Sequence, residues 1–180
     1  ELLKRFPLLV QNLAKQLGKD ILLNIKGGEL AVDRFVMEHV SEALVHLLRN
    51  SCDHGIEPPE RRVLSGKPAQ GTLTLSLRSI DTGLQVEVQD DGAGLSREAI
   101  LGRAHKLGLS LPDPASDEAV WALVLAPGFS TAPAVTELSG RGVGLDVVRC
   151  AVEALGGKLS IRSAPGQGTA FVLDLPLPAP

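Results

Sequence analysis

The sequence predicts an α/β fold of the α+β kind, a two-layer sandwich in which helices cover one face of a mixed, mostly antiparallel sheet. Three observations predict it. Segments with helical and with alternating hydrophobic spacing are interspersed along the chain, neighbouring strand segments are joined by short turns, and no internal repeat is present. The 180 residues, 44% of them hydrophobic, suffice for the core of one domain, which we expect over residues 1–180.

The first third of the chain contains the clearest helix. Asp33 stands where an N-cap residue is expected, and the apolar residues after it recur at helical spacing up to Gly55. The expected core stripe of this helix consists of Val36, Val40, Ala43, Leu44, Leu47 and Leu48. Before it we expect a helix over residues 7–17, a strand over 21–25 and a short strand over 29–32 that pairs back on the first.

The rest of the chain combines strands with an irregular stretch. We expect strands around residues 73–77 and 84–88, short helices over 97–106 and 117–125, a helix over 145–155, and a hairpin of 159–162 with 171–175. Between Asp90 and Gly144, prolines and glycines are frequent. A stretch this long and irregular is typical of a lid or a binding loop.

Composition excludes several classes of protein. The 18 basic and 21 acidic side chains give a formal net charge of −3. This net charge provides no general electrostatic attraction to nucleic acid or to an anionic membrane. Aromatic residues make up only 3%, too few for the stacking platforms of single-stranded nucleic-acid binders. Cys52 and Cys150 lie in apolar helical patterns that fit a reducing cytoplasm, and no apolar run is as long as a membrane span. The chain begins without Met, and we expect it to be part of a longer protein.

A polar stripe runs along the long helix on a different face from the core stripe. At 100° per residue it contains His39, Glu42, His46, Asn50 and Asp53. A solvated face is the ordinary explanation, but such faces are usually filled with Lys and Glu, which form helices more readily than His, Asn and Asp. The carbonyl oxygen of Asn is a hard ligand, suited to a Mg²⁺ ion that bridges phosphates.

The same helix end offers a weaker alternative, a zinc site. His46, Asp53 and His54 are possible ligands, yet both cysteines are embedded in apolar patterns and no fourth ligand stands at the usual spacing. His54, beside Gly55, is better explained as a side chain that interacts with the C-terminal end of the helix dipole.

Asp90 is a second candidate, at the end of the strand over residues 84–88. Alternation with period two places it on the same face as the apolar residues of that strand, so we expect a buried carboxylate that needs a donor. The exocyclic amine of adenine would supply one, and Gly92 and Gly94 would let the backbone pass close to the base. An acidic turn after a strand is the common alternative.

A third candidate is the glycine-rich run that opens the helix at Leu145. Gly140, Gly142 and Gly144 recur at every second residue, and backbone N–H groups at a helix N-terminus form a natural seat for phosphate. A dinucleotide fingerprint is disfavoured, because its glycine spacing differs and no strand immediately precedes the run. Gly166 and Gly168 are explained equally well by a plain hairpin turn.

Taken in this order, the segments resemble the ATP-binding domain of the GHKL superfamily, the Bergerat fold of gyrase, heat-shock chaperone, histidine kinase and MutL proteins. The resemblance is closest to the CheA-type chemotaxis histidine kinases and spans nearly the whole chain. The motifs that carry it are an N box over residues 46–55, a first glycine box over 90–94, a Phe box over 126–131, a second glycine box over 140–148 and a last box over 166–169.

The resemblance implies roles for individual residues. In such proteins the residue matching Asp90 binds adenine, the one matching Asn50 coordinates the Mg²⁺ that bridges the phosphates, and the one matching His46 lies beside the phosphates. His46 and Asn50 are thus implied as catalytic, and residues 95–143 as the ATP lid. The implied nucleotide-binding residues are His46, Asn50, Asp53, His54, Asp90, Gly92, Gly94, Arg103, Ser130, Thr131, Gly140, Arg141, Gly142, Val143, Gly144, Leu145 and Thr169.

The resemblance also implies partners. Such kinases use ATP and Mg²⁺ to phosphorylate a histidine on a separate phosphotransfer domain of the parent kinase, from which a response regulator takes the phosphoryl group. A coupling protein and receptors are implied to contact domains missing from this chain. We expect a cytoplasmic protein with no nucleic-acid partner and no membrane insertion.

One position departs from the family pattern. Family members often carry a lysine just after the Phe-Ser-Thr run, where this chain has Ala132. A nearby cation can replace it, because phosphoryl transfer depends on positioning and charge neutralisation; the candidates are Arg97, Arg103, Lys106 and Arg141. Two alternative functions stay open: a hydrolytic GHKL ATPase, and a non-catalytic nucleotide-binding or docking module.

Overall fold

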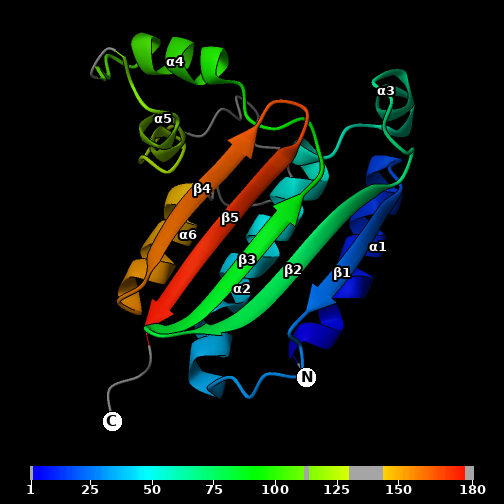
Figure 1. The fold of residues 1–180 in the computed structure, drawn as a ribbon, viewed down its shortest axis with the longest axis vertical. Helices are drawn as coiled ribbons and strands as arrows, with labels where there is room; N and C mark the ends of the chain where they lie inside the picture. The colour runs from blue at the N-terminus through cyan, green and yellow to red at the C-terminus, as the bar shows by residue number, and fades with distance from the viewer. Residues whose placement is uncertain (1, 112–113, 130–143, 177–180) are drawn as a thin grey trace.

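The computed structural model describes residues 2–111, 114–129 and 144–176. At its centre is a five-stranded sheet with helices behind it (Figure 1). In their order across the sheet, the strands are β1 (Ile21–Lys26), β2 (Gly71–Ile80), β3 (Gly83–Asp90), β5 (Gly168–Pro176) and β4 (Lys158–Ala164). β1 and β2 pair in parallel, and the other three pairings are antiparallel. The predicted two-layer sandwich with a mixed, mostly antiparallel sheet is confirmed.

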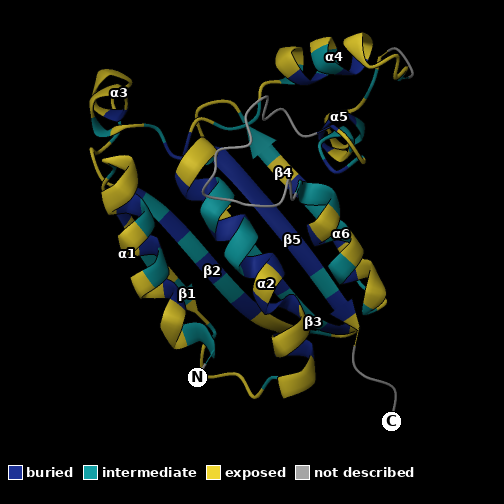
Figure 2. Ribbon diagram, turned by 180° about the vertical axis from the view of Figure 1, so that it is seen from behind, coloured by how far each residue is buried: buried dark blue, intermediate teal, exposed yellow. Residues whose placement is uncertain are grey.

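Three helices form the second layer: α1 (Phe6–Leu17), α2 (Arg34–Asn50) and α6 (Leu145–Ala154). Seen from behind, they turn exposed residues outward over a sheet whose central strands are largely buried (Figure 2). The other helical elements are η1 (Leu2–Arg5), the π-helical turn η2 (Ser51–Gly55), α3 (Pro59–Leu64), α4 (Arg97–Lys106) and α5 (Asp117–Leu123). Within the described ranges, no helix has the length and apolar character needed to cross a bilayer.

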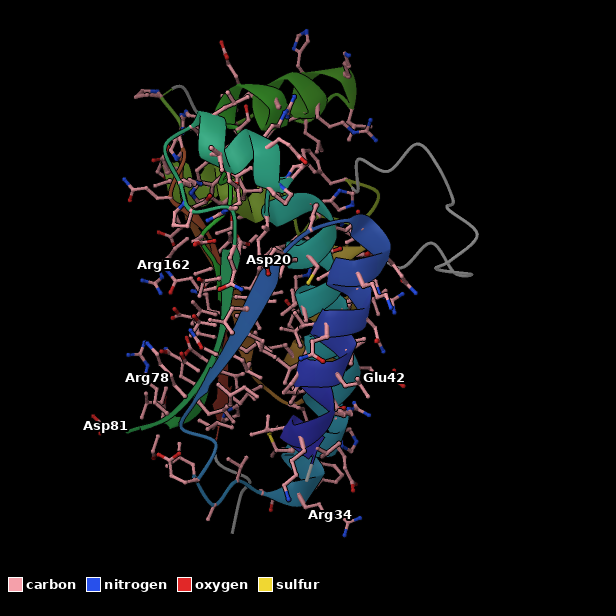
Figure 3. The ribbon with its side chains drawn as sticks, turned by 90° about the vertical axis from the view of Figure 1, so that its right-hand side faces the viewer. Asp20, Arg34, Glu42, Arg78, Asp81 and Arg162 are labelled. Carbon is pink, nitrogen blue, oxygen red and sulfur yellow. The ribbon has the colours of Figure 1, made fainter. Side chains whose placement is uncertain are left out.

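The two faces of the sheet differ in character. Edge-on, Arg78 and Arg162 project from the face that the helices leave open, whereas Glu42 projects away from the sheet on the far side of the helical layer (Figure 3). Glu42 is exposed, as a solvated helix face predicts. The core lies between the sheet and the helices.

The long helix α2 forms where the sequence predicts it. The Asp33 side chain accepts a hydrogen bond from the backbone N–H of Val36 at 3.2 Å, which caps the helix. All six residues of the expected core stripe are buried. The helix therefore lies on the sheet with a fixed rotation, and its C-terminal end reaches the end of β3.

Two expectations for the first seventy residues are wrong. Residues 29–32 form a turn and loop, in which the Leu30 N–H closes a turn on the carbonyl of Gly27 at 3.1 Å, and the strand that pairs with β1 is β2. Residues 58–71, where Pro58, Pro59, Gly66 and Gly71 predict a loop, contain α3. Its six residues show too little periodicity for a helix to be recognised in the sequence.

Candidate functional site

The carboxylate of Asp90 lies at the end of β3 on the buried face of the sheet. The residue is 2% exposed and continues the row of Val86 and Val88, as the alternation predicts. The backbone N–H groups of Gly92 and Thr169 donate to its Oδ1 at 2.9 and 3.3 Å. Among the described residues no hydrogen bond reaches Oδ2, so one oxygen of this buried acid is left for a ligand.

Burial raises the pKa of Asp90, because a carboxylate is disfavoured away from water. The N–H groups of Gly92 and Thr169 oppose this rise in pKa, as does the hydroxyl of Ser51, which lies nearby without meeting hydrogen-bond geometry. The charge of Asp91 adds to the rise. Burial deprives this carboxylate of hydrogen bonds from water. A ligand that donates a hydrogen bond to it would replace one of them.

Backbone surrounds the Asp90 carboxylate closely. A Cβ atom on Gly92 would lie 1.9 Å from the carbonyl oxygen of Gly55, and one on Gly168 would lie 1.9 Å from that of Asp90. A Cβ on Gly55 would lie 2.7 Å from Asp90 Oδ2. These segments can meet only because the contact positions are glycine. We refer to Asp90, Gly55, Gly92 and Thr169 as the Asp90 end of the site.

A charged network beneath the Asp90 end was missed in the sequence. Arg62 is 1% exposed, and its Nη2 donates to Asp91 Oδ2 at 3.0 Å. Glu57 accepts from Arg62 Nη1 at 3.1 Å and from Lys67 Nζ at 2.9 Å. Burial alone would raise the pKa of Glu57, but its own backbone N–H, Lys67 and Arg62 hold that pKa below its usual range. Little in the sequence indicates this network, because charged residues in a loop normally face solvent.

The second part of the site lies on the last turns of α2, where His46 and Asn50 are half-buried. We refer to these two residues as the Asn50 end. Burial lowers the pKa of His46, the charge of Arg49 lowers it further, and Asp146 in the first turn of α6 opposes them. His46 is therefore neutral at pH 7, and the N-terminus of α6 is close to it.

Asn50 fits the ligand expected for Mg²⁺. Among the described residues its side chain has no hydrogen-bond partner, so its carbonyl oxygen is available to a hard cation. The described residues contain no group of three or more His, Cys, Asp or Glu side chains that could hold a metal alone. Magnesium at Asn50 would therefore need most of its ligands from phosphate and water.

The π-helical turn η2 joins the two ends of the site. The Ile56 N–H donates to the carbonyl of Ser51, five residues earlier, at 2.8 Å. Ser51 and Gly55 both lie beside the Asp90 carboxylate, so Asn50, the residue before Ser51, is brought near the same acid. The end of the segment over residues 46–55 therefore lies against the segment over residues 90–94.

Asp53, expected on the polar stripe of the long helix, lies instead in the π-helical turn that follows α2. Asp53 and His54 are exposed and lie 3.5 Å apart, between Oδ2 and Nε2. Lys19 Nζ donates to the carbonyls of Cys52 and Asp53 at 2.7 and 2.8 Å and so holds the turn. Burial lowers the pKa of Lys19, while Asp53 opposes that shift.

Cys52 lies inside the π-helical turn. Its thiol is buried, and burial raises its pKa to about 11. Cys150, on α6, is exposed. The two free cysteines therefore have opposite environments.

The other predicted site residues fall into two groups. Thr169 lies at the Asp90 end, Gly94 turns with φ 78° beside Ala164, Gly144 and Leu145 begin α6, and Arg103 is half-buried on α4. The structure does not describe Ser130, Thr131, Ala132, Gly140, Arg141, Gly142 and Val143. The Asp90 end and the Asn50 end are thus placed, whereas most of the predicted glycine seat for phosphate is not.

Comparison with known proteins identifies relatives along nearly the whole chain. Residues 37–179 match the family described as histidine kinase-, DNA gyrase B-, and HSP90-like ATPase. The chemotaxis protein CheA of Bacillus subtilis is 47% identical over 96% of this chain and 26% of its own length. CheA of Treponema pallidum is 43% identical over 98% of this chain and 22% of its own length. The chain therefore spans about a quarter of the length of the curated relatives it matches.

Solved structures support the fold class. The catalytic domain of histidine kinase ThkA superposes with a TM-score of 0.59 at 18% identity, over 97% of this chain and 90% of that domain. A blue-light activated histidine kinase from Erythrobacter litoralis gives a TM-score of 0.54 at 19% identity, over 94% of this chain and 39% of that protein. At these identities the likeness shows the fold alone.

Proposed function

Because this chain belongs to the family of histidine kinase-, DNA gyrase B- and HSP90-like ATPases, we propose that it binds Mg-ATP and passes the γ-phosphoryl group to a histidine on a separate phosphotransfer domain. The observation that carries the proposal is Asp90, a buried acid with one oxygen engaged and the other without a hydrogen bond from any described residue. The 6-amino group of adenine is a donor that fits this second oxygen. Identity to CheA proteins favours transfer to histidine over other reactions of the family.

The Asn50 end would receive the phosphates. Asn50 would hold Mg²⁺ together with phosphate oxygens, and the bound ion would neutralise phosphate charge during transfer. The neutral His46 imidazole can form a hydrogen bond beside the phosphates without adding a charge. Gly144 and Leu145 begin α6, whose backbone N–H groups favour an anion.

We extend the proposal to residues 95–143 as a lid over the nucleotide. Within the described part of this segment, Arg97 Nη1 lies 2.7 Å from Asp117 Oδ1 and joins α4 to α5. α5 also contacts β4. Arg103 on α4 is our candidate for the cation that replaces the lysine missing at Ala132.

The proposed partners follow from the relatives. We infer that the parent protein is a cytoplasmic kinase with its own phosphotransfer domain, that a response regulator receives the phosphoryl group, and that a coupling protein and receptors bind elsewhere in the parent. The CheA relatives, which are about four times longer than the matched segment, leave room for such domains.

Labelled ATP, Mg²⁺ and a phosphotransfer domain taken from a CheA relative test the proposal. We expect label on the histidine of that domain, and none when EDTA removes the metal. Steady phosphate release without acceptor, with no label transferred, would instead indicate a hydrolytic ATPase. Tight ATP binding with neither transfer nor hydrolysis would indicate a non-catalytic nucleotide-binding or docking module.

A further inference from the structure

Arg62 is a buried cation that the proposed reaction does not use. Its guanidinium donates to four oxygens: Pro68 O at 2.7 Å, Glu57 Oε1 at 3.1 Å, Asp91 O at 3.2 Å and Asp91 Oδ2 at 3.0 Å. Two of these bonds end on the residue that follows Asp90 in the chain. A buried guanidinium with this many charged and backbone partners fixes the position of whatever it holds.

Lys67 holds the same stretch of backbone. Its Nζ donates to Asp91 O at 3.0 Å, to Gly92 O at 2.7 Å and to Glu57 Oε2 at 2.9 Å. Arg62 and Lys67 thus meet on one carbonyl oxygen, that of Asp91. Their two positive charges are balanced by Glu57 and Asp91, so the cluster is neutral as a whole.

The peptide between Asp91 and Gly92 links this cluster to Asp90. Its carbonyl oxygen accepts from both cations, and its N–H donates to Asp90 Oδ1 at 2.9 Å. A cation on the carbonyl side polarises a peptide group and makes its N–H a stronger donor. The chain of contacts therefore runs from the cations, through one peptide, to the buried carboxylate.

This peptide is prevented from rotating. The Asp91 N–H donates to Thr72 O at 3.1 Å, and the Thr72 N–H donates back to Asp91 Oδ1 at 2.9 Å. On the other side, the Ala93 N–H donates to Gly55 O at 3.1 Å. The loop after β3 is thus held on both sides, and the Gly92 N–H keeps pointing at Asp90.

We propose that Arg62 and Lys67 are positioning residues for adenine recognition, which act through the Asp91–Gly92 peptide to hold Asp90 with Oδ1 engaged and Oδ2 presented to the 6-amino group of the base. This inference rests on the proposed function. A purely structural role, anchoring α3 to the sheet, would stabilise the fold without any preference for the 6-amino group. The two roles therefore predict different ligand dependence.

The variant Lys67→Met tests the inference, since it removes one cation and leaves Arg62 in place. Binding of ATP and of purine riboside triphosphate, which lacks only the 6-amino group, is measured by calorimetry on the 180-residue chain. We expect the variant to bind ATP about fivefold more weakly, while binding of the analogue changes less than about twofold. Lys67→Arg should restore most of the preference for ATP. Lys158→Met, which removes an exposed cation at the opposite end of the sheet, should change neither affinity.

The outcomes separate this inference from the proposed function. If the unchanged protein binds both nucleotides equally, Asp90 does not recognise the 6-amino group. That result overturns the proposed function itself, on which this inference rests. If it prefers ATP, and Lys67→Met keeps that preference or loses both affinities to the same degree, the positioning role is wrong. Circular dichroism shows whether Lys67→Met is folded. If it is not, Lys67→Gln, which keeps a neutral donor, is measured instead, and an unchanged preference overturns the inference.

Discussion

The Asp90 end and the Asn50 end lie at opposite sides of one π-helical turn. They differ in how many hydrogen bonds the protein itself makes to their polar side chains. Asp90 Oδ1 already accepts two backbone hydrogen bonds, and charged residues below the loop hold the donor Gly92 in place. Asn50 and His46 have no side-chain hydrogen bond among the described residues. One end is preorganised by protein contacts, and the other depends on its ligand.

This difference assigns separate tasks to the two ends. A preorganised acid selects a ligand by its hydrogen-bond donors, because little reorganisation is needed when the ligand binds. An amide without a protein partner contributes little until phosphate and a metal ion are present. Changes at the Asp90 end should therefore affect binding and stability, and changes at the Asn50 end should affect transfer.

The largest expected effect is on the packing of the Asp90 end. Gly168→Ala places a Cβ 1.9 Å from the Asp90 carbonyl oxygen at a φ of 96°, so we expect a loss of more than about 3 kcal/mol in the free energy of unfolding. Gly166→Ala is the matched control, since its φ is 73° but no atom of the described residues lies within 4 Å of the added Cβ. It should cost about 1 to 2 kcal/mol. Urea unfolding measures both, and equal losses would contradict the close approach.

The second-largest expected effect is a loss of ATP affinity. Asp90→Asn removes the charge that receives the adenine amine, and a charge-assisted hydrogen bond contributes about 1.5 to 3 kcal/mol, so ATP affinity should fall roughly 10- to 100-fold. Calorimetry measures the affinity. Asp81→Asn, in the exposed turn at the other end of β3, is the control and should bind ATP normally. An Asp90→Asn protein with full affinity would refute adenine recognition by this acid.

At the Asn50 end we expect a substitution to affect phosphoryl transfer more than nucleotide binding. Asn50→Ala should slow Mg²⁺-dependent phosphoryl transfer about tenfold or more, because it removes a proposed metal ligand. ATP affinity measured without metal should change by less than about threefold. Asn24→Ala, an exposed asparagine on β1, is the control. Equal transfer rates in the presence of an acceptor domain would show that Asn50 is not a ligand.

The smallest effect is the pH dependence of the Asp90 end. The pKa of Asp90 is raised by burial, so in the window between the ordinary aspartate pKa of about 3.9 and its raised value the folded protein keeps a proton that the unfolded chain has lost. The contribution of Asp90 to the free energy of unfolding of the ligand-free protein is therefore highest below this pH window and falls as pH rises through it. ATP affinity should change in the opposite direction, because binding needs the carboxylate. Both trends should be absent in Asp90→Asn.

Most elements that position the site could be predicted from the sequence. Asp33, the core stripe of α2 and the alternation up to Asp90 are local patterns, and local patterns are what single-sequence reasoning detects. These patterns suffice to place Asp90 on the buried face and Asn50 near the end of a long helix. The resemblance to the CheA-type kinases then implied that these two residues serve one nucleotide site, Asp90 at the adenine and Asn50 at the phosphates.

The parts that could not be predicted depend on contacts between distant residues. Arg62 and Asp91 are separated by 29 positions, and each looks like an ordinary surface charge until β2 and β3 bring them together. The π-helical turn depends on Lys19, more than thirty residues upstream, which holds the carbonyls of Cys52 and Asp53. The partner of β1 is also distant in sequence: it is β2, whereas the adjacent residues 29–32, expected as a strand, form a turn and loop.

The contrast between the two cysteines has a practical consequence. A thiol reacts as its thiolate, so at neutral pH Cys52, with a pKa of about 11 and no exposure, stays inert while the exposed Cys150 reacts. A maleimide dye would therefore attach to one place only, in the helix that begins at Leu145. The natural chain thus carries its own single labelling position, from which fluorescence can follow nucleotide arrival without any engineered substitution.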